Sequence, residues 1–263
     1  MGVIDVRNIT KIFGKRKVLD NVNLQITKGE TMVIMGGSGC GKSTLLRIII
    51  GTLKPDSGEV LINGKDITKL DEDGLAEVRK KFGMLFQSAA LFNSMTVGEN
   101  VALPLREHTK LNDAIVSIMV KMKLELVGLT GFENLKPAEI SGGMKKRVGL
   151  ARAIAMDPEI VFYDEPGAGL DPIVSSVIDK LITDLSKKLG ITSVVVTHEM
   201  GSAFRIADRM AMLYQGRVLE VGTPPEIKNS QNPIIQQFIT GSPDGPIPLK
   251  RSSTDYLKDL TGG

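Results

Sequence analysis

A glycine-rich stretch that ends in a lysine and a serine carries the clearest chemistry in the sequence. It reads Gly-Gly-Ser-Gly-Cys-Gly-Lys-Ser over residues 36–43, between an apolar stretch, Thr31–Met35, and a helical pattern over residues 44–50. The spacing G-x-x-x-x-G-K-S between a strand and a helix is typical of a loop that binds phosphates. Glycines allow the backbone N–H groups to point at a polyphosphate, and the positive end of the following helix adds to the attraction. The stretch predicts a nucleotide site.

Two side chains of this loop have separate roles in the predicted site. We expect Lys42 to reach the β- and γ-phosphates and the Ser43 hydroxyl to ligate Mg²⁺. A glycine-rich turn that arises by chance is the alternative interpretation, which the flanking strand and helix make a poor one. The expected nucleotide contacts in this loop are Gly36, Gly37, Ser38, Gly39, Cys40, Gly41, Lys42, Ser43 and Thr44.

Two adjacent carboxylates end a second apolar stretch. Residues 159–163 predict a buried strand, and Asp164 and Glu165 follow at its carboxyl end. Ligands of open α/β sheets lie at these strand ends. One carboxylate there suits the shell of a magnesium ion, and the other suits the activation of water. An ordinary acidic pair in solvent is the alternative, and it would be the better interpretation if the pair stood alone.

Three other candidates also lie at the ends of predicted strands. Gln87 follows the short apolar strand at 82–86, and His198 follows the β-branched strand at 192–196. His198 therefore emerges beside the predicted phosphates. Phe13 ends the strand at 3–12. Its spacing alone favours a place in the core, and the functional alternative is a ring stacked on adenine.

A second phosphate-binding device lies at residues 140–152. Ser141 is a suitable helix cap, and Gly142 and Gly143 leave backbone N–H groups open at a helix N-terminus.

Between residue 88 and about residue 155 the strand signals vanish, which suggests a helical subdomain inserted into an α/β core. An apolar stripe in this part is interpreted as core; its residues are Leu111, Ile115, Ile118, Met119 and Met122.

Composition sets the broad class of protein. The chain has 263 residues, of which 42% are hydrophobic, and its net charge of +3 is spread out, so we expect no nucleic-acid partner. The single cysteine, Cys40, excludes an internal disulfide and suits a reducing compartment. Because Cys40 lies near Lys42 and a helix N-terminus, we expect a favoured thiolate there. No apolar run approaches the roughly 18 residues that span a bilayer, so we expect a cytosolic protein.

Taken together, the motifs identify the chain as a member of the nucleotide-binding subunits of ABC transporters, over roughly its first 235 residues. Residues that match in order and spacing are Phe13, 36–43, Gln87, 140–144, Asp164, Glu165, Asp171 and His198. The resemblance implies an α/β P-loop core with a β-rich N-terminal portion and an inserted helical subdomain. It also implies that Phe13 packs on adenine, that Gln87 contacts Mg²⁺ and the membrane partner, that Glu165 is the general base, and that His198 contacts the γ-phosphate.

The same resemblance implies a head-to-tail homodimer around a twofold axis. ATP at Lys42 and Ser43 of one copy would be closed over by Ser141 and Gly143 of the other. Two segments depart from the common pattern. Met144 stands where many members have glutamine, and residues 168–171 read Ala-Gly-Leu-Asp where Ser-Ala-Leu-Asp is common. Because Ser141 and Gly143 are kept, we expect ATP hydrolysis to survive.

A narrower resemblance concerns three segments, 86–92, 103–108 and 140–147, which are similar to the ATPases of Mla-type phospholipid transporters. It implies a permease that docks near residues 87–105, an MCE-domain lipid-binding partner, and a place on the cytoplasmic face of the inner membrane. ATPases of DNA repair carry long coiled coils for which the chain has no room. An FtsE-like cell-division regulator, an iron–sulfur assembly ATPase and an importer ATPase for another solute share the nucleotide motifs and stay open.

The expected domain boundaries follow from these patterns. Residues 1–240 form the ATPase domain, with the helical subdomain at about 88–157, and residues 241–263 form an extension. Prolines and glycines make its first part a linker. Residues 253–260 have the pattern of a short helix, which we expect to dock on the other ATPase subunit.

Overall fold

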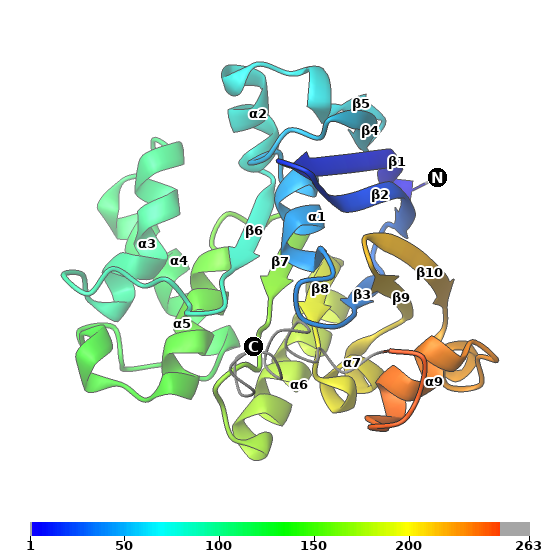
Figure 1. The fold of residues 1–263 in the computed structure, drawn as a ribbon. Helices are drawn as coiled ribbons and strands as arrows, with labels where there is room; N and C mark the ends of the chain where they lie inside the picture. The colour runs from blue at the N-terminus through cyan, green and yellow to red at the C-terminus, as the bar shows by residue number, and fades with distance from the viewer. Residues whose placement is uncertain (1, 248–263) are drawn as a thin grey trace, which may run out of the picture.

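The computed structural model describes residues 2–247, which contain two sheets (Figure 1). The smaller sheet is antiparallel and has the order β2-β1-β4-β5. It confirms the β-rich N-terminal portion, and a turn at Asn63-Gly64, a pair that favours tight hairpins, joins β4 to β5. Its strands are β1 Gly2–Phe13, β2 Arg16–Thr27, β4 Ser57–Ile62 and β5 Lys65–Asp66.

The larger sheet has the order β10-β9-β3-β8-β7-β6, and all its neighbours are parallel except β9 and β10. Every residue of β3 and β8 is buried. Continuous apolar or β-branched runs are typical of parallel strands that are covered on both faces. The strands are β3 Thr31–Met35, β6 Phe82–Leu85, β7 Ile160–Asp164, β8 Thr192–Thr197, β9 Arg209–Tyr214 and β10 Arg217–Gly222.

Alternation along β3 divides the core into two clusters. Met32 and Ile34 pack with α1 and the antiparallel sheet, whereas Val33 and Met35 belong to the cluster on the other face. In Figure 1, α1 lies between the two sheets and α6 lies below the larger one. The helices around the core are α1 Lys42–Ile49, α2 Glu72–Arg79, α6 Pro172–Leu189, α7 Met200–Ile206, α8 Pro224–Lys228 and α9 Pro233–Thr240.

A helical part lies to one side of the core, on the left in Figure 1. It consists of α3 Val97–His108, α4 Asp113–Leu126 and α5 Gly142–Ala153, which all lie between β6 and β7 in the chain. Ser141 caps α5, because its Oγ accepts from the Met144 N–H at 3.3 Å. This cap is the one that the sequence predicts.

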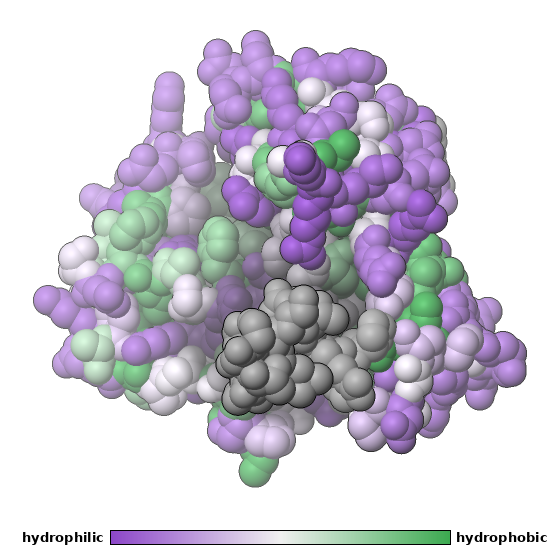
Figure 2. All heavy atoms as spheres, in the orientation of Figure 1, coloured by the Kyte–Doolittle hydropathy of each residue, from purple (hydrophilic) through white to green (hydrophobic). Residues whose placement is uncertain are grey.

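The expectation that the apolar stripe at residues 111–122 is core is wrong for four of its five residues. Leu111, Ile115, Ile118 and Met122 are exposed, by 40–59%, whereas Met119 is partly buried and packs against the core. Helix α4 instead buries the face that carries Val116, Val120 and Leu124. Both faces of α4 carry apolar side chains at helical spacing, so periodicity alone selects the wrong one. Figure 2 shows hydrophobic side chains on the surface of the helical part.

The end of the described chain folds back on α9. Residues 241–247 contain no helix or strand. The side chain of Gln237 donates to the Ile247 carbonyl at 3.3 Å and accepts from the Ile247 N–H at 2.6 Å. The predicted docking segment at residues 253–260 lies outside the described residues. Within residues 2–247, no helix is both long and apolar enough to cross a membrane.

Candidate functional site

The loop between β3 and α1 requires glycine at two positions. Gly36 has a φ of 153°, and a Cβ there would lie 2.2 Å from the carbonyl O of Leu213. Gly41 has a φ of 112°, and a Cβ there would lie 2.9 Å from the carbonyl O of Val18. Since real Cβ contacts are longer, any other residue would displace the backbone. The loop is therefore wedged between β2 and β9.

Lys42 begins α1 and is only 8% exposed. Its Nζ donates to the carbonyl O of Gly36 at 2.6 Å and to that of Gly37 at 3.1 Å. A buried ammonium requires such acceptors. The lysine thus lies against the loop that the sequence predicts to bind phosphates, with its charge directed into the loop.

A hollow of about 260 Å³ opens beside this loop, and Phe13 lines it. The Phe13 ring is 48% exposed and lies 5.5 Å from the Lys11 ammonium, so it is not a core residue. Arg16 also lines the hollow and donates to the Gly39 carbonyl at 3.2 Å, a contact that sequence reasoning missed. Its place in the basic turn directly after Phe13 was the available signal. The remaining lining residues are Val18, Gly39, Gly41, Lys42, Ser43 and Thr44.

Cys40 does not have the environment that was expected for it. Burial raises the pKa of the Cys40 thiol above its ordinary value, and the nearby positive charge of Lys42 opposes this shift without overcoming it. The expectation of a favoured thiolate is therefore wrong. Sequence proximity to Lys42 identified the charge but not the burial, which depends on residues distant in the chain.

The carboxyl ends of β7 and β8 bring three candidates together. Glu165 directly follows Asp164, and its Oε1 lies 2.8 Å from Nδ1 of His198. The Thr197 hydroxyl donates to Glu165 Oε2 at 3.1 Å. Because β7 and β8 are parallel neighbours, their carboxyl ends lie at the same edge of the sheet, which is the edge that the sequence predicts.

Asp164 connects this edge to the phosphate loop. Burial raises the pKa of Asp164 most strongly and the adjacent Glu165 raises it further, while the charges of Lys42 and Lys146 lower it. Lys42 is thus close enough to act on Asp164. Gln87 follows β6, the strand beside β7, and its side chain is exposed.

The second predicted phosphate device does not join this centre within one chain. Ser141 and Gly142 are exposed, and neither they nor Gly143 lines the hollow beside the loop. A Cβ at Gly143 would lie 2.5 Å from Cγ1 of Val174, so α5 approaches α6 closely at this point. Asp171 also lies outside the hollow. It caps α6 by accepting from the backbone N–H groups of residues 173 and 174, at 3.0 Å each.

A groove of about 450 Å³ lies where the helical part meets β6. It is largely apolar, and two of its three phenylalanines, Phe86 and Phe92, are each about half exposed. Its lining residues are Phe82, Gly83, Met84, Phe86, Ala90, Phe92, Leu103, Pro104, Glu107, His108, Arg152, Ala153 and Met156. Several of these belong to the segment 87–105 that the sequence predicts to face a membrane partner.

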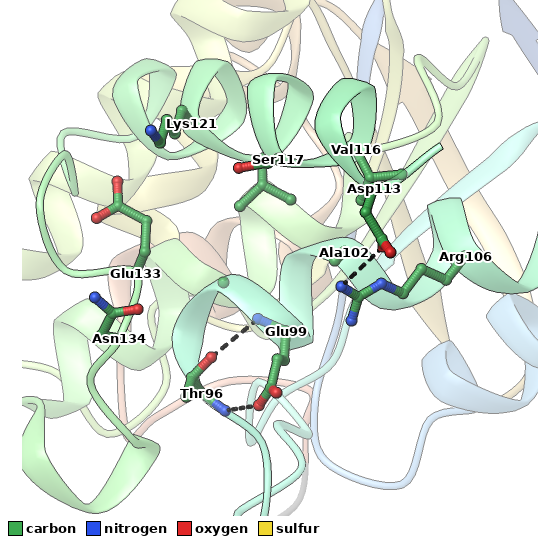
Figure 3. A pocket seen from close by; sticks show the side chains of 12 residues that line it. Thr96, Glu99, Ala102, Arg106, Asp113, Val116, Ser117, Lys121, Glu133 and Asn134 are labelled. Atoms are coloured by element: carbon green, nitrogen blue, oxygen red, sulfur yellow. Dashed lines mark hydrogen bonds and ion pairs between the residues drawn. The ribbon is translucent and has the colours of Figure 1, made fainter. Parts of the chain in front are cut away.

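A third hollow lies between α3 and α4 (Figure 3). Its walls carry charges of both signs, among them the ion pair of Arg106 and Asp113 at 3.4 Å. Glu99 and Thr96 form a capping box at the start of α3. Since no predicted site residue lines this hollow, we assign it no part in nucleotide binding.

Comparison with known proteins shows which family the chain resembles. A family profile described as ABC transporter matches residues 19–168. The chain is 46% identical over 258 residues to the intermembrane phospholipid transport system ATP-binding protein MlaF of Haemophilus influenzae, which covers 98% of both chains. It is 42% identical to a probable ribonucleotide transport ATP-binding protein, mkl, of Mycobacterium leprae, over 97% of this chain and 74% of that one.

The fold also matches a solved structure. This is the dimer of an ATP-binding cassette in a post-hydrolysis state, bound to ADP and Pi. The TM-score is 0.77 and the identity 36%, over 84% of this chain and 98% of that chain.

Proposed function

Because this chain belongs to the ATP-binding proteins of ABC transporters and hydrolyses ATP to power transport, we propose that it drives phospholipid movement between membranes. The identity of 46% to the phospholipid transport ATPase, which extends over 98% of both chains, carries this proposal. The aligned residues include the segments that line the apolar groove beside β6. The mycobacterial relative makes ribonucleotide transport a second candidate.

In the proposed site, ATP binds with its adenine against Phe13 and its phosphates in the loop 36–43. Lys42 exchanges the carbonyl oxygens of Gly36 and Gly37 for the β- and γ-phosphates, since a phosphate oxygen is a stronger acceptor for an ammonium. Arg16 adds a second positive charge beside the loop. The buried position of Lys42 supports this role, because a low-dielectric site strengthens its attraction for the phosphates.

Magnesium fits the donors that the chain offers. Ser43, Gln87 and Asp164 supply hydroxyl, amide and carboxylate oxygens, which are the hard donors that Mg²⁺ prefers. Among residues 2–247, no three His, Cys, Asp or Glu side chains are grouped to hold a metal by themselves. This finding agrees with a site in which ATP phosphates complete the shell. When bound, the ion neutralises phosphate charge.

We assign the activation of water to Glu165. Its carboxylate lies at the strand end beside Asp164, and contacts with Thr197 and His198 orient it. Glu165 accepts the proton of the attacking water, and His198 then contacts the γ-phosphate. The exposed side chain of His198 supports this second role, because it is free to move from the carboxylate to the phosphate.

A second copy of the chain completes the site in this proposal. Ser141 and Gly143 lie away from the phosphate loop of their own chain and are open to solvent or partly so. A head-to-tail pair would place them over the γ-phosphate bound by the other copy, with Asp171 at the same interface. The similar cassette solved as a dimer with ADP and Pi supports this arrangement.

The apolar groove beside β6 is the proposed docking site of the permease. It lies next to Gln87, so a partner seated there contacts the segment 87–105 directly. The complex then includes an MCE-domain lipid-binding protein and lies on the cytoplasmic face of the inner membrane. Removal of the γ-phosphate opens the dimer, and the permease follows.

Affinity purification from the native membrane tests the proposed function. A tag on this chain is used to isolate the complex in mild detergent, and the co-purifying membrane proteins and bound small molecules are identified. We expect a permease, an MCE-domain protein, and phospholipid enriched over a matched purification of an unrelated membrane complex. Bound ribonucleotide other than ATP or ADP, without enriched phospholipid, would favour the second candidate and contradict the first.

A further inference from the structure

A buried lysine on α5 contacts two segments of the catalytic centre. Lys146 is only 4% exposed and lies on the same helix as Ser141–Gly143. Its Nζ donates to the backbone carbonyl O of Gln87 at 2.5 Å and to that of Glu165 at 3.2 Å. One ammonium group thus joins the end of β6 to the end of β7.

The groups around Lys146 stabilise the positive charge of its ammonium at a buried position. Burial lowers the pKa of Lys146 below its ordinary value, and the nearby carboxylates of Asp164, Glu165 and Glu199 oppose this shift without overcoming it. A lysine is almost never fully buried unless it is paired. Here two carbonyl acceptors and three nearby negative charges offset part of its loss of water.

The backbone that Lys146 holds at Glu165 is in an uncommon conformation. Glu165 has a φ of 48°, in the left-handed region that non-glycine residues avoid. Its carbonyl accepts from Lys146 and from the Ala168 N–H at 3.2 Å. The direction of the Glu165 side chain depends on this φ, so the two donors help to set where its carboxylate points.

The same face of α5 holds the segment after Gln87. Arg152 donates to the carbonyls of Ala89 and Ala90 at 2.7 and 2.8 Å. Both alanines have positive φ, of 60° and 47°. Gly149 lets this segment approach, since a Cβ there would lie 3.2 Å from that of Ala89. Helix α5 therefore contacts the segment from 87 to 90 at several points. Within residues 2–247, its side-chain hydrogen bonds reach Glu165 only through Lys146.

We propose that Lys146 is a positioning residue that sets the Glu165 carboxylate relative to Gln87. When the segment that faces the membrane partner moves, Lys146 then shifts the Glu165 carboxylate, which is the group that activates water. This inference rests on the proposed function, because it takes Glu165 as the base and the groove beside Gln87 as the docking site. Lys146 itself touches no substrate and acts through two backbone carbonyls.

Enzyme kinetics of the purified membrane complex test this role. The first variant is Lys146→Met, which keeps an unbranched side chain and removes all donors. Lys146→Arg retains the charge and the donors. Lys121→Met is the control, because Lys121 lies on α4, lines the hollow that has no part in nucleotide binding, and makes no side-chain hydrogen bond or ion pair with the described residues. Each variant is characterised by kcat and KM for ATP hydrolysis, by affinity for a fluorescent ATP analogue, and by its thermal unfolding midpoint.

For Lys146→Met we expect kcat to fall by about 10- to 100-fold, because misplacing a catalytic group by about 1 Å has an effect of that order. The KM and the affinity for the analogue should stay within about twofold, since the loop 36–43 and Phe13 are not touched. We expect Lys146→Arg to recover kcat to within about threefold of the unchanged protein. Lys121→Met should leave all four quantities unchanged.

Three outcomes would overturn the positioning role. The first is a kcat of Lys146→Met within about twofold of the unchanged protein. The second is a loss that appears only in ATP affinity or in unfolding temperature and that Lys146→Arg does not recover. If Lys146→Met does not fold, Lys146→Ala, which removes all donors and leaves room for water beside the two carbonyls, is measured instead. Normal kcat in Lys146→Ala, or failure of that variant to fold as well, would be the third.

Glu165→Gln in the same complex separates this inference from the proposed function. Normal hydrolysis by Glu165→Gln would remove Glu165 as the base, and the proposed mechanism would fail with it. An inactive Glu165→Gln beside a fully active Lys146→Met would leave the proposed function standing and remove only the role of Lys146.

Discussion

Two glycine-rich helix N-termini of this molecule, at α1 and at α5, differ in how much of a phosphate site each provides. At α1, the loop 36–43 is wedged between strands and holds a lysine that is 8% exposed. At α5, Ser141 and Gly142 are exposed, and a serine cap is the main polar group. Both offer open N–H groups and the positive end of a helix. Only the first directs a buried charge into its own loop, since the buried Lys146 of α5 donates to the carbonyls of Gln87 and Glu165 instead.

In the proposed dimer, this difference indicates that the two N-termini have different roles, one in each copy. In the proposed site, the loop at α1 binds phosphate without help, because neighbouring strands already fix its backbone. The end of α5 needs a second surface before it excludes water from a phosphate, and electrostatic attraction is weak while it stays exposed. Variants that act on one N-terminus and not on the other therefore test the comparison directly.

The largest effect is expected for Lys42→Ala, which removes the buried charge of the first N-terminus. We expect kcat/KM for ATP to fall by at least about 10³-fold, since the variant loses a charge-assisted contact in the ground state and in the transition state. Steady-state ATP hydrolysis and binding of a fluorescent ATP analogue measure the two parts. Unchanged kcat/KM would mean that the phosphates bind elsewhere.

A smaller effect is expected for Ser141→Asp, which places a negative charge at the second N-terminus. Aspartate is as good a helix cap as serine, so α5 should keep its stability. Repulsion of the γ-phosphate should lower ATP turnover by at least about 10-fold, while the affinity of the isolated subunit for ATP stays unchanged. Ser141→Asn keeps the cap without the charge and is the matched control. Equal turnover in Ser141→Asp and Ser141→Asn would argue against phosphate contact at Ser141.

Mixing these two variants sharpens the comparison. A mixed dimer of Lys42→Ala and Ser141→Asp has one site with both changes and one site with neither, if each site combines α1 of one copy with α5 of the other. With random pairing and independent sites, activity should return to roughly a quarter of that of the unchanged protein. ATP hydrolysis is measured after the two variants are mixed at equal concentrations. No recovery above either variant alone would mean that both N-termini act on the same nucleotide within one chain.

The smallest effect concerns Cys40, which lies inside the first N-terminus. Because burial raises its pKa, Cys40 should react with iodoacetamide more slowly than a free thiol at neutral pH. The rate should rise as the pH approaches the raised pKa, since the thiolate is the reactive form. Mass spectrometry of labelled protein against pH measures the rate. Faster labelling than glutathione at neutral pH would show a favoured thiolate and contradict the burial that the structure gives.

Much of the site was predictable because its signals are local. The loop 36–43, the acidic pair after β7 and the histidine after β8 each follow an apolar strand within a few residues. Parallel strands place such residues at one edge of the sheet. The predicted strand at 31–35 coincides with β3, and the Ser141 cap lies where its sequence pattern places it.

The features that could not be predicted depend on contacts between distant parts of the chain. Lys146 is one of three consecutive basic residues at 145–147, and nothing local distinguishes the buried one. The burial of Cys40 and the approach of Arg16 to Gly39 also arise from tertiary packing. The buried face of α4 was predicted wrongly for another reason. The helix has two apolar faces, and the choice between them depends on how α3 and α5 are placed.

The exposed stripe of α4 has a consequence for how the protein is produced. Ile115, Ile118 and Met122 present apolar surface to water on one face of α4, and Leu111 does so just before the helix begins. Such surface favours self-association when a subunit is synthesised in excess of whatever normally covers it. Yield and solubility during overexpression should therefore depend on subunit balance, and polar replacements at these four positions should improve recovery of the isolated chain without touching its phosphate loop.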